Sequence, residues 1–118
     1  MHELSLVGAD GNRLAASVAG NIDQPTILLA HGGGQTRHAW GNTMKTLGAR
    51  GYRAIAVDLR GHGDSDWSEH GRYELDAFAA DLIAVARHLG RPPRFRLPAA
   101  GFNRRGNAAA WRLAAMRE

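Results

Sequence analysis

The chain has 118 residues, of which 44% are hydrophobic and 22% charged, a balance typical of a single folded domain rather than of a disordered segment. It contains no cysteine, which excludes disulfides, thiolate metal sites and cysteine nucleophiles. No stretch reaches the roughly 18 apolar residues that a membrane helix needs, and Met1-His2-Glu3 lacks the basic-then-apolar opening of a signal peptide, so we expect no membrane association and a cytoplasmic location.

The net charge of +4 is concentrated at the C-terminal end of the chain. Residues 1–90 carry eight Lys and Arg against ten Asp and Glu, a net charge of −2, whereas residues 91–118 carry seven Arg against Glu118 alone, a net charge of +6. Arginines and Trp111 could contact nucleic-acid phosphates and bases, but the segment carries no recognisable nucleic-acid-binding motif. We therefore do not expect nucleic acid as a partner.

The first part of the chain predicts a β-hairpin followed by a buried strand. Two short apolar runs, residues 4–7 and 14–18, flank Asp10-Gly11-Asn12, whose residue types favour a tight turn. Residues 26–30 are apolar after Thr26, a pattern typical of a parallel strand that is covered on both faces.

The next part predicts a helix, a strand and a second helix. Trp40, Met44 and Leu47 recur at helical spacing, and residues 54–57 form another fully apolar run. A polar, glycine-rich segment covers residues 58–72, and apolar residues at helical spacing over 75–89 predict a helix that ends at Gly90. This alternation predicts an α/β fold in which the hairpin is followed by parallel strands with flanking helices.

The pattern changes after Pro93. A further parallel strand should follow, but Arg94-Phe95-Arg96-Leu97 would place two guanidinium groups on a face that should be covered, so we expect no central strand there. Residues 107–117 predict a weakly amphipathic helix. We therefore divide the chain into a partial domain, residues 1–93, and an Arg-rich basic tail, residues 94–118, that is irregular, helical or disordered.

The segment His31-Gly32-Gly33-Gly34 directly follows the predicted strand 26–30. Open α/β sheets place their ligand sites at the carboxyl ends of their strands. Glycines let the backbone turn its N–H groups toward a ligand, and such donors stabilise the negative oxygen that develops on a substrate carbonyl. Loss of one donor costs on the order of 3 kcal/mol of transition-state stabilisation.

Residues 28–34, with Trp40 a few positions later, resemble the oxyanion segment of the α/β-hydrolase superfamily, in its esterase, epoxide-hydrolase and haloperoxidase-like branch. A second segment, residues 58–65, is similar to the family's loop Asp-x-Arg-Gly-x-Gly-x-Ser. Together the two motifs predict that residues 1–93 form the N-terminal half of an α/β-hydrolase fold.

The resemblance implies a role for each matching residue. Gly33 corresponds to the oxyanion-hole donor, acting through its backbone N–H, and His31, Gly32 and Gly34 support it. His31 matches a histidine that orients the loop rather than a catalytic base. A structural role is implied for the matching residues of the second motif, which are Asp58, Arg60, Gly61, Gly63 and Ser65.

Two local alternatives in the second motif are disfavoured. Ser65 lies close in sequence to His62 and Asp64, but neighbouring side chains of one loop rarely adopt the geometry of a catalytic triad. His62, Asp64 and Asp66 could suggest a metal site, but no second, spaced cluster of ligands accompanies them. We expect neither a metal nor a cofactor.

The resemblance also shows what the sequence lacks. The family's next strand ends in a nucleophile elbow, Gly-x-Ser-x-Gly or a relative, and this chain has no such motif, nor the later acid and histidine. We therefore expect a truncated hydrolase that is inactive, from a parent acting on a small ester-like, epoxide or related substrate. The alternative is a non-catalytic binding or assembly protein whose basic tail contacts an anionic partner.

A shift of reading frame is one hypothesis for the tail. Reading the codons of Phe102, Asn103 and the next two arginines one base later permits Ser-Thr-Gly-Gly after a small residue, which resembles the missing elbow. Translating the coding DNA in all three frames past Pro93 tests this hypothesis.

The missing strand has a consequence for association. Without it, the strand over residues 26–30 would become a sheet edge whose unpaired backbone groups invite pairing with another chain. We therefore expect a marginally stable chain that associates through this edge.

Overall fold

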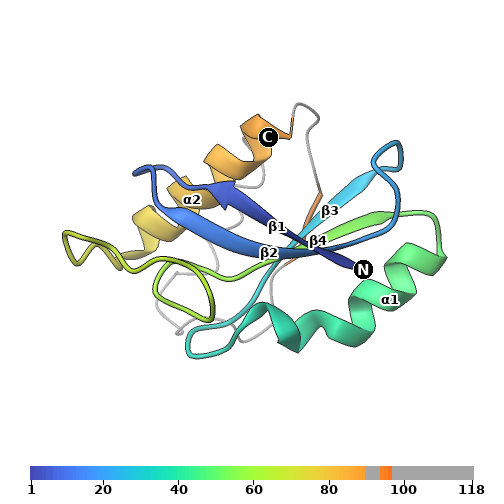
Figure 1. Cartoon of the computed structure of the whole chain (residues 1–118), viewed down its shortest axis with the longest axis horizontal. Coiled ribbons are helices and arrows are strands. Elements are labelled where there is room, and N and C mark those ends of the chain that lie inside the picture. The colour runs from blue at the N-terminus through green and yellow to red at the C-terminus, as the bar shows by residue number, and fades with distance from the viewer. Residues whose placement is uncertain (90–93, 97–118) are drawn as a thin grey trace.

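The computed structural model describes residues 1–89 and 94–96 (Figure 1). In chain order the described elements are β1 (His2–Val7), β2 (Arg13–Ala19), β3 (Thr26–Ala30), the 3-10 helix η1 (Arg37–Trp40), α1 (Gly41–Ala49), β4 (Arg53–Val57), α2 (Leu75–His88) and β5 (Arg94–Arg96). The predicted hairpin, both buried strands and both helices are confirmed, and no helix in the described part of the chain is long and apolar enough to cross a membrane.

The described strands form one mixed sheet in the order β1-β2-β4-β3-β5. β1 pairs antiparallel with β2, and β2 pairs antiparallel with β4. β3 pairs parallel with β4, with Ala30 opposite Val57. The carboxyl ends of β3 and β4 therefore lie side by side at the same edge of the sheet.

The two helices cover opposite faces of the sheet (Figure 1). Leu28 and Ala30 of β3 pack in the cluster that contains Phe78, Leu82 and Val85 of α2. Ile27 and Leu29, which alternate with them, pack in the cluster around Met44 of α1. Both faces of β3 are thus buried, which explains why its sequence is apolar without alternation.

The prediction that no central strand follows Pro93 agrees with the structure, but the prediction that the strand over residues 26–30 becomes the sheet edge is wrong. Arg94–Arg96 forms β5, which pairs parallel with β3 and sets Phe95 opposite Leu28. The prediction considered only the side chains, whereas the backbone N–H and C=O groups of β3 need partners whatever side chains the neighbouring strand carries. Among the described strands, β5 rather than β3 therefore forms this edge of the sheet. The predicted helix over residues 107–117 lies outside the described residues, as does the rest of the tail past Arg96.

Candidate active-site loops

The two sequence motifs become neighbours because β3 and β4 are adjacent and parallel. The loop after β3, residues 31–36, is called the glycine loop below, and the loop after β4, residues 58–66, is called the Arg-Gly loop. Both leave the sheet at the same edge, as their in-register pairing requires. The resemblance placed its candidate residues in these two loops, and the structure brings the loops together.

Two of the three glycine N–H groups of the glycine loop donate hydrogen bonds to side chains. Gly32 donates its N–H to Oε1 of Gln35 over 3.0 Å, and Gly34 donates its N–H to Nε2 of His62 over 3.2 Å. The N–H of Gly33 donates no hydrogen bond within the described residues, and Gly33 is exposed. Among the three glycines of this loop, Gly33 is thus the one whose amide has no hydrogen-bond partner within the described residues.

His31 is fully buried between the two loops. Its Nδ1 lies 2.7 Å from the carbonyl oxygen of Gly32, and its Nε2 accepts the N–H of Leu59 over 3.0 Å. A carbonyl can only accept, so Nδ1 carries the proton. Burial lowers the pKa of His31, which keeps the ring neutral.

The carboxylate of Asp58 anchors the start of the Arg-Gly loop. Asp58 is fully buried and accepts the backbone N–H groups of Arg37 and Asp64, over 2.6 and 3.0 Å, together with the guanidinium of Arg37. Burial alone would raise the pKa of Asp58, but these donors outweigh it and hold that pKa below its ordinary value. Arg37, itself buried, also donates to Oγ of Ser17.

Gly63 and Ser65 support this arrangement through contacts with Asp58. A Cβ atom on Gly63 would lie 2.2 Å from Oδ2 of Asp58, and the φ of +49° at Gly63 also favours glycine. Oγ of Ser65 donates to the carbonyl oxygen of Asp58 over 2.6 Å and accepts the N–H of Ala15 over 2.9 Å. Backbone groups therefore engage the Ser65 hydroxyl, and no triad forms with His62 and Asp64.

Arg60 connects the Arg-Gly loop to α2. Its Nε and Nη2 donate to the two carboxylate oxygens of Asp81 over 2.7 and 2.6 Å, and both side chains are about 1% exposed. Nη1 donates to Asp10 over 2.9 Å. The hydrogen bonds that Arg60 donates to Asp81 and, less strongly, to Asp10 outweigh the effect of burial and raise the pKa of Arg60. Next to Arg60, Gly61 has a φ of +75°, and a Cβ there would lie 2.6 Å from the ring of Tyr73.

Three residues of this framework were not among the candidates from sequence: Arg37, His62 as a hydrogen-bond acceptor, and Asp81. Asp81 carried a usable signal, because it lies beside Leu82 on the apolar face of the predicted helix, where a carboxylate needs a cation. Arg37 and the acceptor role of His62 carried none, since each depends on a contact across more than 20 residues.

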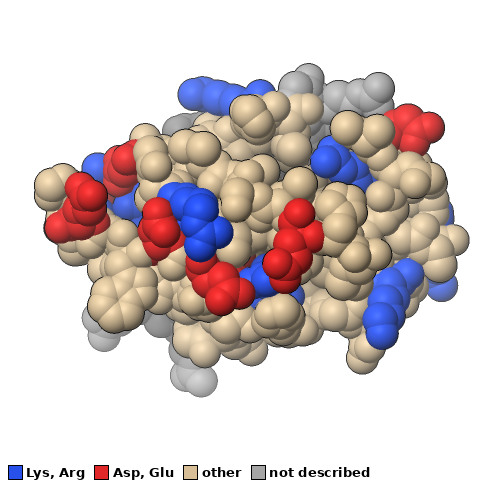
Figure 2. All heavy atoms as spheres, viewed as in Figure 1, with Lys and Arg blue, Asp and Glu red and all other residues tan. Residues whose placement is uncertain are grey.

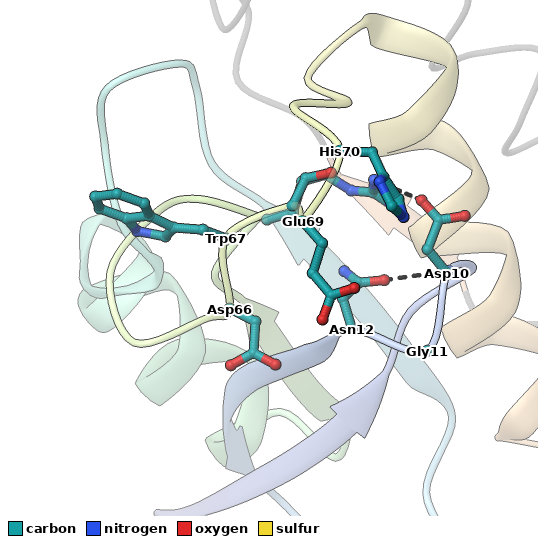
Figure 3. Close-up of a pocket in the computed structure, with 9 residues that line it drawn as sticks. Asp10, Gly11, Asn12, Asp66, Trp67, Glu69 and His70 are labelled. Atoms are coloured by element: carbon teal, nitrogen blue, oxygen red, sulfur yellow. Dashed lines mark hydrogen bonds and ion pairs between the residues drawn. The ribbon is translucent and has the colours of Figure 1, made fainter.

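A separate cavity of about 360 Å³ lies between the β1–β2 turn and residues 66–70 (Figure 3). Glu69 points toward Asn12 and Asp66, whereas the indole of Trp67 points away from them (Figure 3). Arg60 and Arg72 pair with Asp10, and Arg13 pairs with Asp66. No glycine-loop residue lines this cavity, and the described residues include no group of three metal-binding side chains.

Charged side chains on the face over β1 and β2 adjoin one another with opposite sign (Figure 2). Arg37 pairs with Glu3 and Asp64, and Arg13 pairs with Asp66. This face therefore carries no continuous basic surface of the kind that tracks a nucleic-acid backbone.

Comparison with known proteins identifies the family. The sequence profile of the alpha/beta hydrolase fold matches residues 25–95. The chain is 39% identical over 92 residues to an esterase of Mycobacterium tuberculosis (strain ATCC 25618 / H37Rv), covering 78% of this chain and 28% of the esterase. It is 44% identical over 64 residues to a non-heme haloperoxidase of Rhodococcus erythropolis, covering 54% of this chain and 23% of that protein.

Solved structures show the same relationship. An epoxide hydrolase from an endophytic Streptomyces superimposes with a TM-score of 0.78 at 29% identity, covering 94% of this chain and 32% of the other. The epoxide hydrolase VrEH1 from Vigna radiata gives a TM-score of 0.76 at 26% identity, covering 85% and 31%. The chain belongs to the α/β-hydrolase family. It has the N-terminal portion of that fold and spans about a quarter of the length of the curated relatives named above.

Proposed function

We propose that this chain carries the oxyanion-loop portion of an α/β-hydrolase active site, with the backbone N–H of Gly33 as the donor. In the parent enzyme this donor would stabilise the negative oxygen formed during hydrolysis of an ester, epoxide or related bond of a small molecule. The observation that carries the proposal is that the amides of Gly32 and Gly34 are engaged while the exposed amide of Gly33 is not.

The proposal includes inactivity of the 118-residue chain itself. The sequence contains no nucleophile elbow, and the two histidines of the site are committed to backbone groups of the loops. Incubation of the chain with p-nitrophenyl acetate should release nitrophenolate no faster than buffer does. Turnover that is lost on Gly33→Pro would contradict inactivity and would favour a complete enzyme.

The role of Gly33 is tested in a chimera that joins residues 1–93 to the C-terminal remainder of the M. tuberculosis esterase, in place of its own matching segment. Gly33→Pro removes the N–H, so kcat/KM should fall about 10²- to 10³-fold. Gly33→Ala keeps the N–H, and its Cβ would meet no atom of the described residues within 4 Å, so this control should stay close to full activity. Equal activity of the two variants would refute the assignment, provided that their circular dichroism spectra agree.

A further inference from the structure

Reciprocal hydrogen bonds from backbone amides to histidines join the glycine loop and the Arg-Gly loop. His31 of the glycine loop accepts the N–H of Leu59 in the Arg-Gly loop over 3.0 Å. His62 of the Arg-Gly loop accepts the N–H of Gly34 in the glycine loop over 3.2 Å. Each loop therefore supplies one imidazole acceptor for a backbone amide of the other.

The ring of His62 is held in one orientation by three contacts. Its Nδ1 lies 3.0 Å from the carbonyl oxygen of Arg60, so Nδ1 carries the proton and Nε2 presents its lone pair to Gly34. The ring of Phe78 meets it edge-on with centroids 6.1 Å apart, and the ring of His31 lies 4.9 Å away. These contacts fix both the tautomer and the direction of the acceptor.

Packing does not fix the tip of the glycine loop. Within the described residues, no atom lies within 4 Å of the position that a Cβ on Gly33 or Gly34 would take, so the backbone is not packed against a neighbour on that side. Gly34 also has a φ of +78°, in the region that glycine enters with little cost. The position of this tip therefore depends on hydrogen bonds, and the bond to His62 is the one that joins the tip to the Arg-Gly loop.

We propose that His62 is a positioning residue of the oxyanion site: its Nε2 engages the N–H of Gly34 and so leaves the neighbouring N–H of Gly33 as the free donor. This proposal rests on the function proposed above. It adds a role to a position of the Arg-Gly motif that the family pattern leaves open, since the residue between Gly61 and Gly63 is written there as any residue.

Protonation of His62 should release the glycine loop. An imidazolium donates at both nitrogens, so its Nε2 cannot accept the Gly34 N–H. Besides the Gly34 N–H, the described groups in contact with His62 are the ring of His31, the ring of Phe78 and the carbonyl of Arg60, whose guanidinium is paired with Asp81. Burial lowers the pKa of His31, which favours the neutral form of that ring.

The test is residue-resolved amide hydrogen exchange of the full 118-residue chain, measured by NMR. The Gly34 amide should be protected and the Gly33 amide should exchange freely. His62→Phe keeps an aromatic ring but removes the acceptor, so the Gly34 protection factor should fall at least tenfold. His62→Gln places an amide oxygen near the position of Nε2 and should restore most of the protection. The matched control His70→Phe changes an exposed histidine of the neighbouring segment and should have no effect.

The same measurement on the unaltered chain does not depend on whether the variants fold. The Gly34 protection factor should fall in step with the protonation of His62, followed by the shifts of its own ring protons, while amides in β3 and β4 stay protected. The proposal would be overturned if the Gly34 protection factor changed neither on protonation of His62 nor in His62→Phe. Hydrogen exchange involves no catalysis. If the chimera experiment showed that Gly33 is not the oxyanion donor, the exchange result for His62 and Gly34 would still stand.

Discussion

The close contact between Gly63 and Asp58 makes Gly63 the residue of the Arg-Gly loop least able to accept a side chain. A Cβ would lie 2.2 Å from Oδ2 of the Asp58 carboxylate, which three donors hold in place, and the positive φ adds strain. Gly63→Ala should therefore lower the free energy of unfolding by about 2 kcal/mol or more. Gly33→Ala, in open space, should change it by less than about 0.5 kcal/mol. Urea denaturation of the two variants checks the difference, and equal losses would contradict it.

Burial of neutral His31 makes stability depend on pH. In the unfolded chain the ring titrates near its ordinary value of 6.5, whereas the folded state lowers that pKa. Below that value the unfolded chain binds the extra proton, so the free energy of unfolding should fall as pH decreases from 6.5 toward the lower folded pKa and should be level above it. Denaturation of the chain at a series of pH values measures this dependence. His31→Gln should flatten it, and an unchanged slope in that variant would assign the effect to another group.

At the residue level, the sequence predicts which loops hold the candidate residues better than it predicts the hydrogen-bond partners of those residues. Residues 31–34 and 58–65 were recognised because their glycines and charges stand at fixed spacings. The partners of Asp58 and Arg60 were not predicted, because Arg37 and Asp81 come from other elements and meet these residues only after the sheet and α2 are assembled. The roles of Gly33 and of the supporting residues remain predictions that the experiments above test.

At the level of elements, the buried pair Arg60–Asp81 fastens α2 to the Arg-Gly loop. Asp81 also accepts the N–H of Ala9, so it connects α2 to the hairpin turn as well. Asp81→Ala leaves the Arg60 guanidinium buried beside its lost partner and should cost about 3–5 kcal/mol of unfolding free energy. Asp76→Ala, on the exposed side of the same helix, should cost no more than about 1 kcal/mol, from its interaction with the helix dipole. Thermal or urea denaturation measures both, and similar losses would show that the ion pair contributes little.

The elements themselves were predictable where hydrophobic pattern decides them. β3 and β4 follow from apolar runs, because both faces of each strand are covered, and α2 follows from its apolar face. β5 could not be predicted in the same way. Its three residues form a strand by pairing with β3, and no hydrophobic run in the sequence predicts that pairing.

For the whole molecule, the described sheet ends at β5, which is three residues long beside a five-residue β3. Short pairing leaves backbone groups of β3 and the outer side of β5 without a strand partner among the described residues, and such edges favour pairing with another chain. Sedimentation velocity should show concentration-dependent association of the chain. Ile22→Asp, which removes an exposed apolar side chain from the β2–β3 connection, should leave the association in place. A monomer at all concentrations that melts cooperatively would contradict this prediction.

The contacts of the glycine loop also bear on the order in which a nascent chain gains its structure. Among the described residues, the hydrogen-bond partners of residues 31–37 all lie between Glu3 and Asp64. During synthesis from the N-terminus, these partners leave the ribosome before β5 does. The hydrogen bonds that shape the glycine loop can therefore form while the chain past β5 is still being translated.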